Sequence, residues 1–195
     1  MQVSIVIPTC GRRSSLRATI QSCLHQTLSP ERYEIIVVAN PPNRAIQELL
    51  KELRQTLPGA PGLRYVPCKQ TGAGVARNSG LRAANGKILY LLDDDCQLVA
   101  RDHLERVLCF HEKQPELTGV GGICVSPEGA SWACRYYNAL LELWLYRNRA
   151  LDGSQNVLLG GNASYKHEII EDDFLFNEEW SYGGVETELN QRLAA

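Results

Sequence analysis

The chain has 195 residues, of which 44% are hydrophobic and 22% are charged, a composition typical of one soluble globular domain with a sizeable core. The formal net charge is −2 and no block of lysine and arginine stands out, which argues against a nucleic-acid partner. Seven cysteines without a CxxC pair argue against a disulfide framework and favour the reducing cytosol. We expect neither a signal peptide nor a membrane-spanning helix, because the N-terminus leads straight into a strand-like run and no apolar stretch is long enough.

Short apolar runs alternate with segments of helical periodicity through the first two thirds of the chain. The runs predict buried strands at 3–7, 35–38, 63–66, 87–92 and 119–125. The periodic segments predict helices at 16–24, 46–57, 74–84 and 104–111. Because this alternation is typical of βαβ units, we predict a single α/β domain over residues 1–195, with helices on both faces of a mostly parallel, Rossmann-like sheet.

Residues 132–151 predict a helix of a different kind, since tryptophan, tyrosine and leucine fall on more than one of its faces. Such a helix is buried in a core, or packs on a partner or on a membrane surface. The sequence leaves three alternatives open: core packing, contact within a homo-oligomer, and a peripheral position at the inner face of the membrane.

Three consecutive aspartates, Asp93, Asp94 and Asp95, follow the predicted strand at 87–92 directly. Neighbouring carboxylates repel one another unless a cation or hydrogen bonds compensate them. Open α/β sheets bind ligands at the carboxyl ends of their strands, and hard oxygen ligands there suit Mg²⁺ or Mn²⁺ and hence a diphosphate. If the chain stays extended, Asp93 and Asp95 face one side and Asp94 the other. A solvated acidic turn is the alternative.

Four segments, in this order, resemble the family 2 glycosyltransferases, whose nucleotide-sugar-binding α/β fold is called GT-A. The segments are VSIVIPTCGRRSSL, YEIIVVANPPN, TGAGVARNSGLRAANGKILYLLDDD and YGGVETELNQRL. The resemblance implies a three-layer α/β/α domain with a nucleotide-binding part at about 1–97 and an acceptor and catalytic part at about 98–195. It also implies metal-dependent, inverting transfer of a sugar to the hydroxyl of a glycan, a lipid-linked or another acceptor. UDP-sugar is the favoured donor, with GDP- and dTDP-sugars as alternatives.

The resemblance places nucleotide contacts at the ends of the first two predicted strands. The first set lies where a helix begins, and backbone N–H groups there favour anionic or carbonyl oxygens. This set is Pro8, Thr9, Cys10 and Arg12. A plain turn is the alternative. At the second strand end the family commonly has an aspartate that binds the base, whereas this chain has Asn40, which can still donate and accept hydrogen bonds or be only a turn residue.

A third contact region precedes and follows the strand at 87–92. Gly74 allows the backbone to approach a nucleotide closely, and Arg77 suits pairing with phosphate or with an aspartate of the triplet. The triplet matches the D-x-D motif of the family. By resemblance, Asp95 is the expected metal ligand, with Asp93 as a second one, and both Asp93 and Asp94 face ribose, sugar or a metal-bound water.

Inverting transfer needs a carboxylate opposite the leaving group, which takes the proton of the acceptor hydroxyl. The family places this base in a Glu-Asp pair at the start of a helix, and the pair aligns here with Val185 and Glu186. Glu186 is therefore the predicted base, with a side chain one methylene longer than the usual aspartate. An ordinary first-turn glutamate is the alternative, and Glu188 is the backup carboxylate.

Two glycine-containing places in the last third resemble loops near the donor sugar and the acceptor. The first contains Gly161 and Asn162. The second contains Trp180 and Tyr182, followed by the pair Gly183–Gly184, which together suit a sugar-stacking platform. Packing and turn formation are the alternative roles for both places.

The sequence departs from the family in ways that keep other functions open. Valine replaces the first acid of the pair, and no histidine lies downstream of Glu186, where many relatives complete the metal shell. We therefore expect Asp95, diphosphate and water to hold the metal, or the chain to be a truncated or partnered domain. A non-catalytic nucleotide-sugar-binding domain or subunit is the main alternative. A sugar-phosphate nucleotidyltransferase ranks lower, because the loop after the first strand has only Arg12 and Arg13 and lacks an extended glycine run.

Overall fold

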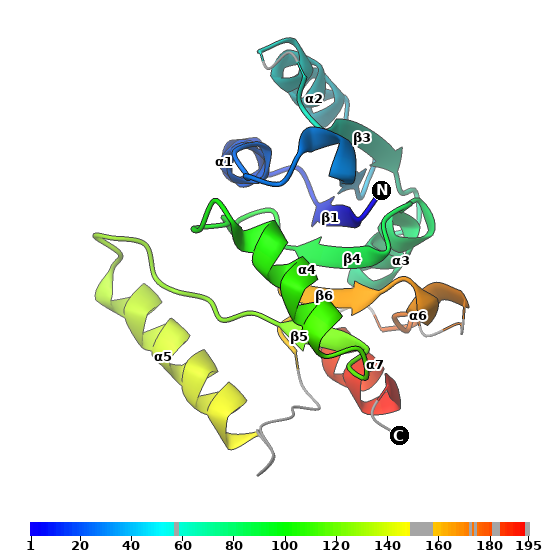
Figure 1. Ribbon diagram of the computed structural model, residues 1–195. Helices are drawn as coiled ribbons and strands as arrows, with labels where there is room; N and C mark the ends of the chain where they lie inside the picture. Colours follow the sequence, from blue (N-terminus) through cyan, green and yellow to red (C-terminus); the bar gives the residue numbers. More distant parts are fainter. Residues whose placement is uncertain (57–58, 149–157, 172, 174, 181–183, 194–195) are drawn as a thin grey trace.

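The computed structural model describes residues 1–56, 59–148, 158–171, 173, 175–180 and 184–193. Within these residues a six-stranded sheet has the strand order β3-β2-β1-β4-β6-β5 (Figure 1). Its strands are β1 (Val3–Thr9), β2 (Tyr33–Ala39), β3 (Gly62–Pro67), β4 (Ile88–Leu92), β5 (Gly119–Gly121) and β6 (Asn162–Lys166). The first four strands are parallel, whereas β6 runs antiparallel to both β4 and β5. The predicted mostly parallel sheet is confirmed.

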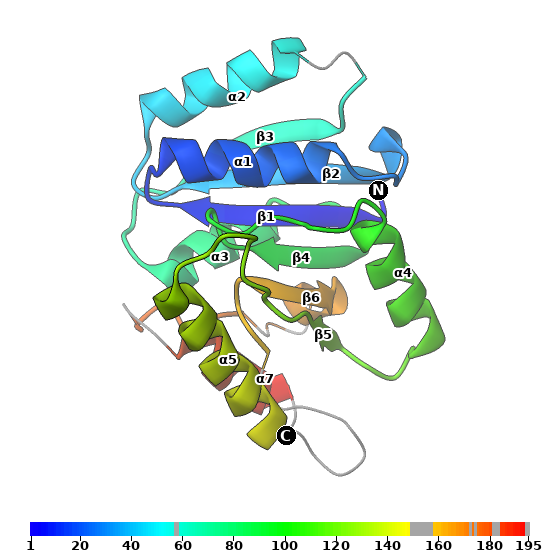
Figure 2. The same ribbon diagram turned by 90° about the vertical axis from the view of Figure 1, so that its left-hand side faces the viewer.

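Helices cover both faces of this sheet (Figure 2). One core contains apolar side chains of α1 (Arg13–Leu24), α2 (Arg44–Thr56) and α4 (His103–Lys113). The other core contains those of α3 (Ala73–Arg82), α6 (Glu168–Glu171) and α7 (Val185–Leu193). Ile5 and Ile7 of β1 belong to the first core and Val6 to the second, because successive side chains of a strand point to opposite faces. Two-sided burial therefore explains the continuous apolar runs, and the three-layer α/β/α fold is confirmed.

The carboxyl ends of the central strands meet at one edge of the sheet. The short η1 turn (Pro30–Arg32) leads into β2, which pairs with β1 so that Thr9 lies beside Ala39. Ala39 is in turn the register partner of Pro67 on β3. The residues that follow these strands therefore gather along one line, although they are far apart in the sequence.

The predicted strand at 119–125 is shorter than expected, because β5 ends at Gly121. The N–H of Gly122 still donates to the carbonyl of Asn162 at 2.9 Å, but β6 begins at that residue, so the strand pairing ends there. The apolar side chains of Ile123 and Val125 are consequently exposed.

Helix α5 (Trp132–Arg147) lies apart from both helix layers (Figures 1 and 2). Trp132 and Tyr146 are more than 70% exposed, and among the residues of this helix only Leu145 is buried. Core packing is therefore wrong for the predicted aromatic helix, whose last residues, 149–151, lie outside the described ones. Contact with a partner or a membrane surface stays a prediction. Among the helices of the described ranges, none has the length and apolarity required to cross a membrane.

Candidate active site

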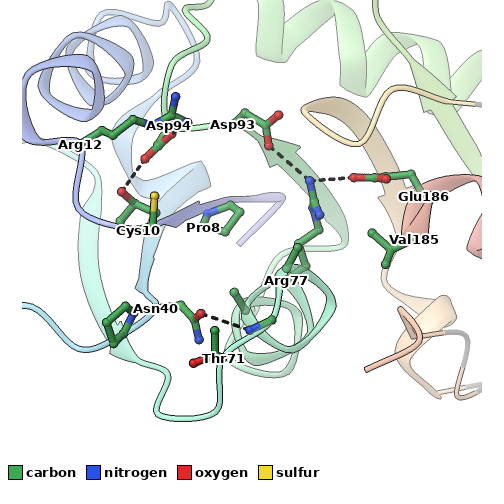
Figure 3. Close-up of a pocket in the computed structure, with 15 residues that line it drawn as sticks. Pro8, Cys10, Arg12, Asn40, Thr71, Arg77, Asp93, Asp94, Val185 and Glu186 are labelled. Atoms are coloured by element: carbon green, nitrogen blue, oxygen red, sulfur yellow. Dashed lines mark hydrogen bonds and ion pairs between the residues drawn. The ribbon is translucent and has the colours of Figure 1, made fainter. Parts of the chain in front are cut away.

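A cavity of about 500 Å³ opens where the carboxyl ends of β1, β2 and β4 meet (Figure 3). It is lined by Pro8, Thr9, Cys10, Arg12, Asn40, Pro41, Thr71, Gly72, Ala73, Ala76, Arg77, Asp93, Asp94, Val185 and Glu186. The strand ends and the residues just after them supply part of this lining, and residues 71–77 together with the first turn of α7 supply the rest. Helix N-termini present unpaired backbone N–H groups, so the cavity has two places that favour an anion.

Most of the residues predicted from the sequence meet in this cavity. Those that line it are Pro8, Thr9, Cys10, Arg12, Asn40, Arg77, Asp93, Asp94 and Glu186. Asp95 does not line it, but follows Asp94 in the same turn and has a side chain that is 46% exposed. Glu188, the backup carboxylate, also does not line it, and accepts a hydrogen bond from Arg192 at 2.5 Å.

The aspartate triplet bends into a turn instead of continuing as extended chain. The carbonyl of Asp93 accepts a hydrogen bond of 3.1 Å from the backbone N–H three residues on. As a result, Asp94 and Asp95 both contact Arg12, whereas Asp93 faces Arg77. The expectation that the triplet continues as extended chain, with Asp94 facing away from Asp95, is wrong, because side chains alternate only along an extended strand and β4 ends just before the triplet.

Asp94 is the buried member of the triplet and is held on two sides. Its carboxylate accepts a hydrogen bond from the hydroxyl of Thr9 at 2.5 Å and forms an ion pair with Arg12. The same guanidinium reaches Asp95, with Nη1 2.7 Å from Oδ2. Although burial disfavours the charged guanidinium, the two carboxylates outweigh this effect and raise the pKa of Arg12. Arg12 therefore clamps the turn that carries the acidic residues.

Arg77 lies between the other two carboxylates of the cavity (Figure 3). Its Nη2 atom is 2.8 Å from Oε1 of Glu186 and 3.4 Å from Oδ1 of Asp93, and its guanidinium carbon is 5.6 Å from the ring centroid of Phe176. The Nε atom is buried and has no hydrogen-bond partner within the described part of the chain, an arrangement that costs about 1–3 kcal/mol. Burial, assisted by the neighbouring carboxylates, raises the pKa of Asp93, and Arg77 only partly opposes this.

The charges around the cavity do not cancel. Two guanidiniums, those of Arg12 and Arg77, face the three carboxylates of the triplet and the carboxylate of Glu186. With all six groups ionised, two negative charges remain uncompensated. A nucleoside diphosphate would meet repulsion here unless a cation came with it.

The donor atoms fit a divalent cation that shares its coordination with a ligand. Within the described ranges, no group of three or more histidine, cysteine, aspartate or glutamate side chains converges as a metal cage. Mg²⁺ and similar ions are commonly held by one or two carboxylates, with phosphate oxygens and water completing the shell. The hard oxygens of the triplet suit that arrangement, and the charge of such a cation would balance the two uncompensated negative charges.

Two glycines pass closely over two of these carboxylates. A Cβ atom on Gly160 would overlap the side chain of Glu186, and one on Gly161 would overlap the carboxylate of Asp93. The carbonyl of Gly161 also accepts a hydrogen bond from the N–H of Asp93 at 3.3 Å. Gly161 therefore lies beside the acidic residues but does not line the cavity, and its predicted contact with the sugar or the acceptor stays a prediction.

Asn40 lines the cavity with its amide already engaged. Its Nδ2 donates to the carbonyls of Cys68 and Gln70, at 3.3 and 2.6 Å, and its Oδ1 accepts from the N–H of Gly72 at 3.3 Å. In this structure the side chain thus holds the loop that precedes α3. Its predicted contact with a base would need one of these bonds to be exchanged.

Two other predicted residues, Gly74 and Asn162, do not line the cavity. Gly74 packs against segment 175–180. A Cβ atom on Gly74 would lie 2.7 Å from the carbonyl oxygen of Asn177. Asn162 accepts a hydrogen bond from the hydroxyl of Tyr90 at 2.5 Å and donates to the carbonyl of Ile123 at 3.1 Å. Both residues organise backbone near the site, and their ligand contacts stay predictions.

The predicted sugar platform lies at the approach to α7. The ring of Trp180 is 3.3 Å from the position of a Cβ atom on Gly184, and neither residue lines the cavity. Tyr182 and Gly183 lie outside the described residues. The platform stays a prediction.

A buried amide that the sequence analysis did not single out holds the segment ahead of α7. Asn78 is fully buried, donates to the carbonyl of Phe176 at 2.8 Å and accepts from its N–H at 2.9 Å. Its only sequence signal is its place after Arg77 on the same helix. Nothing in the sequence indicated that Phe176 and the lining residue Thr71 belong to the site, because their roles depend on contacts with distant segments.

The sheet order, together with an acidic turn at the carboxyl edge of the central strands, defines an α/β domain of the GT-A type. Residues 4–174 match the model of Glycosyl transferase family 2, and the chain belongs to that family. The predicted family and fold are confirmed.

Several known proteins are similar to this chain. Glycosyltransferase AglE of Haloferax volcanii is 25% identical over 186 residues, which cover 93% of this chain and 58% of that protein. The mannosyltransferase PcManGT from Pyrobaculum calidifontis, solved in complex with GDP-Man and Mn²⁺, has a TM-score of 0.74 and 20% identity, and the match covers 96% of this chain and 50% of that one. S. aureus TarS 1–349 in complex with UDP has a TM-score of 0.73 and 16% identity, and the match covers 97% of this chain and 54% of that one. The chain therefore spans between 50% and 58% of the length of AglE, PcManGT and the TarS segment 1–349.

Proposed function

We propose that this chain binds a nucleotide sugar in the cavity and transfers its sugar, with inversion, to an acceptor hydroxyl. The observation that carries the proposal is that Asp93, Asp94 and Glu186 line one cavity, with Arg77 between Asp93 and Glu186. The N-termini of α3 and α7 favour the diphosphate of such a donor. UDP-sugar is the favoured donor, with GDP- and dTDP-sugars as alternatives, and the acceptor is a glycan, a lipid-linked or another hydroxyl compound.

The proposal includes Mn²⁺ or Mg²⁺, held by Asp95 with Asp93 as a second ligand. Its support is the pair of uncompensated negative charges and the hard oxygen donors of the triplet. When bound, such a cation supplies Lewis-acid stabilisation of the charge on the leaving diphosphate. Arg12 would keep the acidic turn in place through its contacts with Asp94 and Asp95.

In the proposed reaction the acceptor oxygen forms a bond to the anomeric carbon of the sugar. The bond from that carbon to the diphosphate oxygen breaks, and its electron pair leaves with the diphosphate. Glu186 takes the proton that the acceptor hydroxyl loses. We assign the nucleotide to the part of the chain at about 1–97, and the acceptor and the base to the part at about 98–195.

A second candidate is a non-catalytic nucleotide-sugar-binding domain. It is favoured by the contact of Glu186 with Arg77, and by the buried Val185 at the position of the first acid of the family pair. Both candidates predict binding of a nucleotide, but only the first predicts turnover.

Binding and turnover can be measured separately. Thermal unfolding of the protein is followed with UDP, GDP and dTDP and with UDP-sugars, each with and without Mn²⁺, and we expect stabilisation that needs both nucleotide and metal. Slow hydrolysis of the bound UDP-sugar is then followed over time. Hydrolysis that requires Mn²⁺ supports the transferase, whereas binding without hydrolysis supports the second candidate. A protein that ignores every nucleotide at millimolar Mn²⁺ contradicts both.

A further inference from the structure

Arg77 is a buried arginine with two anionic partners and an unused donor. Its side chain is 9% exposed and lines the cavity, and its Nη2 atom serves both Glu186 and Asp93. The buried Nε atom has no partner within the described part of the chain. An arginine presents five N–H donors in a planar fork. The guanidinium therefore has hydrogen-bonding capacity to offer to a further acceptor that enters the cavity.

Glu186 is held in an ion pair in this arrangement. Its carboxylate points toward Arg77 (Figure 3), and the 2.8 Å ion pair occupies Oε1. A charge-assisted hydrogen bond of this kind is stronger than one between neutral groups. The carboxylate that would take the proton of an acceptor hydroxyl is thus engaged through one of its two oxygens and turned toward Arg77.

We propose that Arg77 is a latch operated by the donor: it holds Glu186 in the donor-free protein and moves its hydrogen bonds to the diphosphate when a nucleotide sugar binds. The exchange releases Glu186 to act on the acceptor. This inference rests on the proposed function and adds a condition to it, namely that the base is available only after the donor has bound.

A diphosphate is the stronger competitor for this guanidinium. It carries more negative charge and more acceptor oxygens than one carboxylate, and the planar fork of arginine matches phosphate oxygens in pairs. The cation that accompanies the donor also compensates Asp93, the second partner of Arg77. The diphosphate weakens the contact between Arg77 and Glu186, and the cation frees the guanidinium from Asp93.

The surroundings allow the side chain to change partners while the backbone stays in place. Asn78, the next residue on α3, fixes the backbone of Phe176 through hydrogen bonds of 2.8 and 2.9 Å. The contact between Arg77 and the Phe176 ring is a cation–π contact at 5.6 Å, which does not require one exact direction. The guanidinium can therefore keep this contact in both positions.

The latch makes a specific prediction about nucleotide affinity. If Glu186 competes with the diphosphate for Arg77, removing its charge strengthens binding of the nucleotide. We expect Glu186→Gln to tighten binding of UDP or GDP, measured by calorimetry with Mn²⁺, by about tenfold. Glu188→Gln is the matched control, because it removes a glutamate charge from the first turn of the same helix, at a residue that is paired with Arg192 and does not line the cavity. It should leave the affinity unchanged.

A double-mutant cycle separates the latch from a general effect of charge. In the Arg77→Met background the gain from Glu186→Gln should disappear, since the residue for which the two anions compete is absent. Arg77→Gln serves the same purpose if the methionine variant fails to show a cooperative thermal transition. A gain that persists without Arg77, an equal gain for Glu188→Gln, or no gain at all would each overturn the latch. If the wild-type protein binds neither nucleotide, the proposed function itself fails.

Discussion

Nη2 of Arg77 lies 2.8 Å from Oε1 of Glu186, and this ion pair joins helix α3 to the first turn of helix α7 across the candidate site. The sequence suggested each of these residues separately, Arg77 as a phosphate contact and Glu186 as a base. Their pairing gives the two residues a shared role, because whatever binds one of them changes what the other can do.

Loss of the base should abolish turnover and leave the fold intact. We expect Glu186→Gln to lower the rate of sugar transfer or donor hydrolysis by about a hundredfold or more, the usual contribution of a positioned general base. Initial rates are measured at saturating donor and Mn²⁺. Glu168→Gln, in the first turn of α6, is the matched control and should retain the wild-type rate. Full turnover by Glu186→Gln would show that the base is misassigned, and loss in Glu188→Gln instead would move the role to that residue.

Removing the carboxylate of Asp95 should abolish the metal dependence of UDP binding. We expect Asp95→Ala to bind UDP no more tightly with Mn²⁺ than without it, because the predicted ligand has gone, while the metal-independent part of binding stays. Calorimetric titrations with and without the metal measure both parts. The comparison variant is Asp102→Ala, which removes another half-exposed aspartate paired with an arginine, Arg106, at 2.9 Å. Metal-dependent binding that survives in Asp95→Ala rules out this ligand assignment.

A methyl group on Gly161 should disturb the site directly. Its Cβ would overlap the carboxylate of Asp93, so either that side chain or the backbone just before β6 must shift. We expect Gly161→Ala to lower the free energy of unfolding by about 1–3 kcal/mol and to weaken Mn²⁺-dependent UDP binding. Gly62→Ala is a suitable control, because its Cβ would meet only an ordinary contact at 3.7 Å. Equal nucleotide affinity in Gly161→Ala and the wild type would show that Asp93 is not needed in its present position.

Buried His111 should make the fold sensitive to acid. Its Nε2 lies 2.9 Å from Oγ of Ser164, its Nδ1 has no partner in the described ranges, and burial together with Lys166 lowers its pKa from 6.5 to about 4. Between these values the unfolded chain takes up a proton that the folded protein does not. Stability is therefore retained above pH 6.5 and lost as the pH falls toward 4, by about 2–3 kcal/mol.

Urea unfolding at a series of pH values, compared between the wild type and His111→Leu, isolates this contribution from that of the other titrating groups. The difference in unfolding free energy between the two proteins should change across this range, since the leucine variant has no proton to bind. Parallel pH profiles would show that His111 is not responsible for the acid sensitivity.

The sequence predicts the structure best where the apolar pattern and the chemistry of the neighbouring side chains indicate the same feature. The apolar run of β4 and the carboxylates after it predicted both a buried strand and a ligand site at its carboxyl end, and that is where Asp93 and Asp94 line the cavity. Prediction failed for α5, because an apolar pattern alone does not show whether the side chains will be buried or exposed. The aromatic residues of α5 were compatible with core packing, with a partner contact or with a membrane surface, and Trp132 is 75% exposed.

By itself, the sequence determined strands β1 to β5, most of the helices and the carboxylates at the strand ends, because periodicity and residue chemistry act over a few neighbouring residues. It did not predict the antiparallel strand β6. Only the tertiary structure decided that the three aspartates form a turn. As a result, Arg12 forms ion pairs with Asp94 and Asp95, and Arg77 forms ion pairs with Asp93 and Glu186. Such pairings depend on how α3 and α7 pack over the same face of the sheet. No local pattern carries that information, since the partners lie far apart along the chain and meet only after the sheet and its helices have assembled.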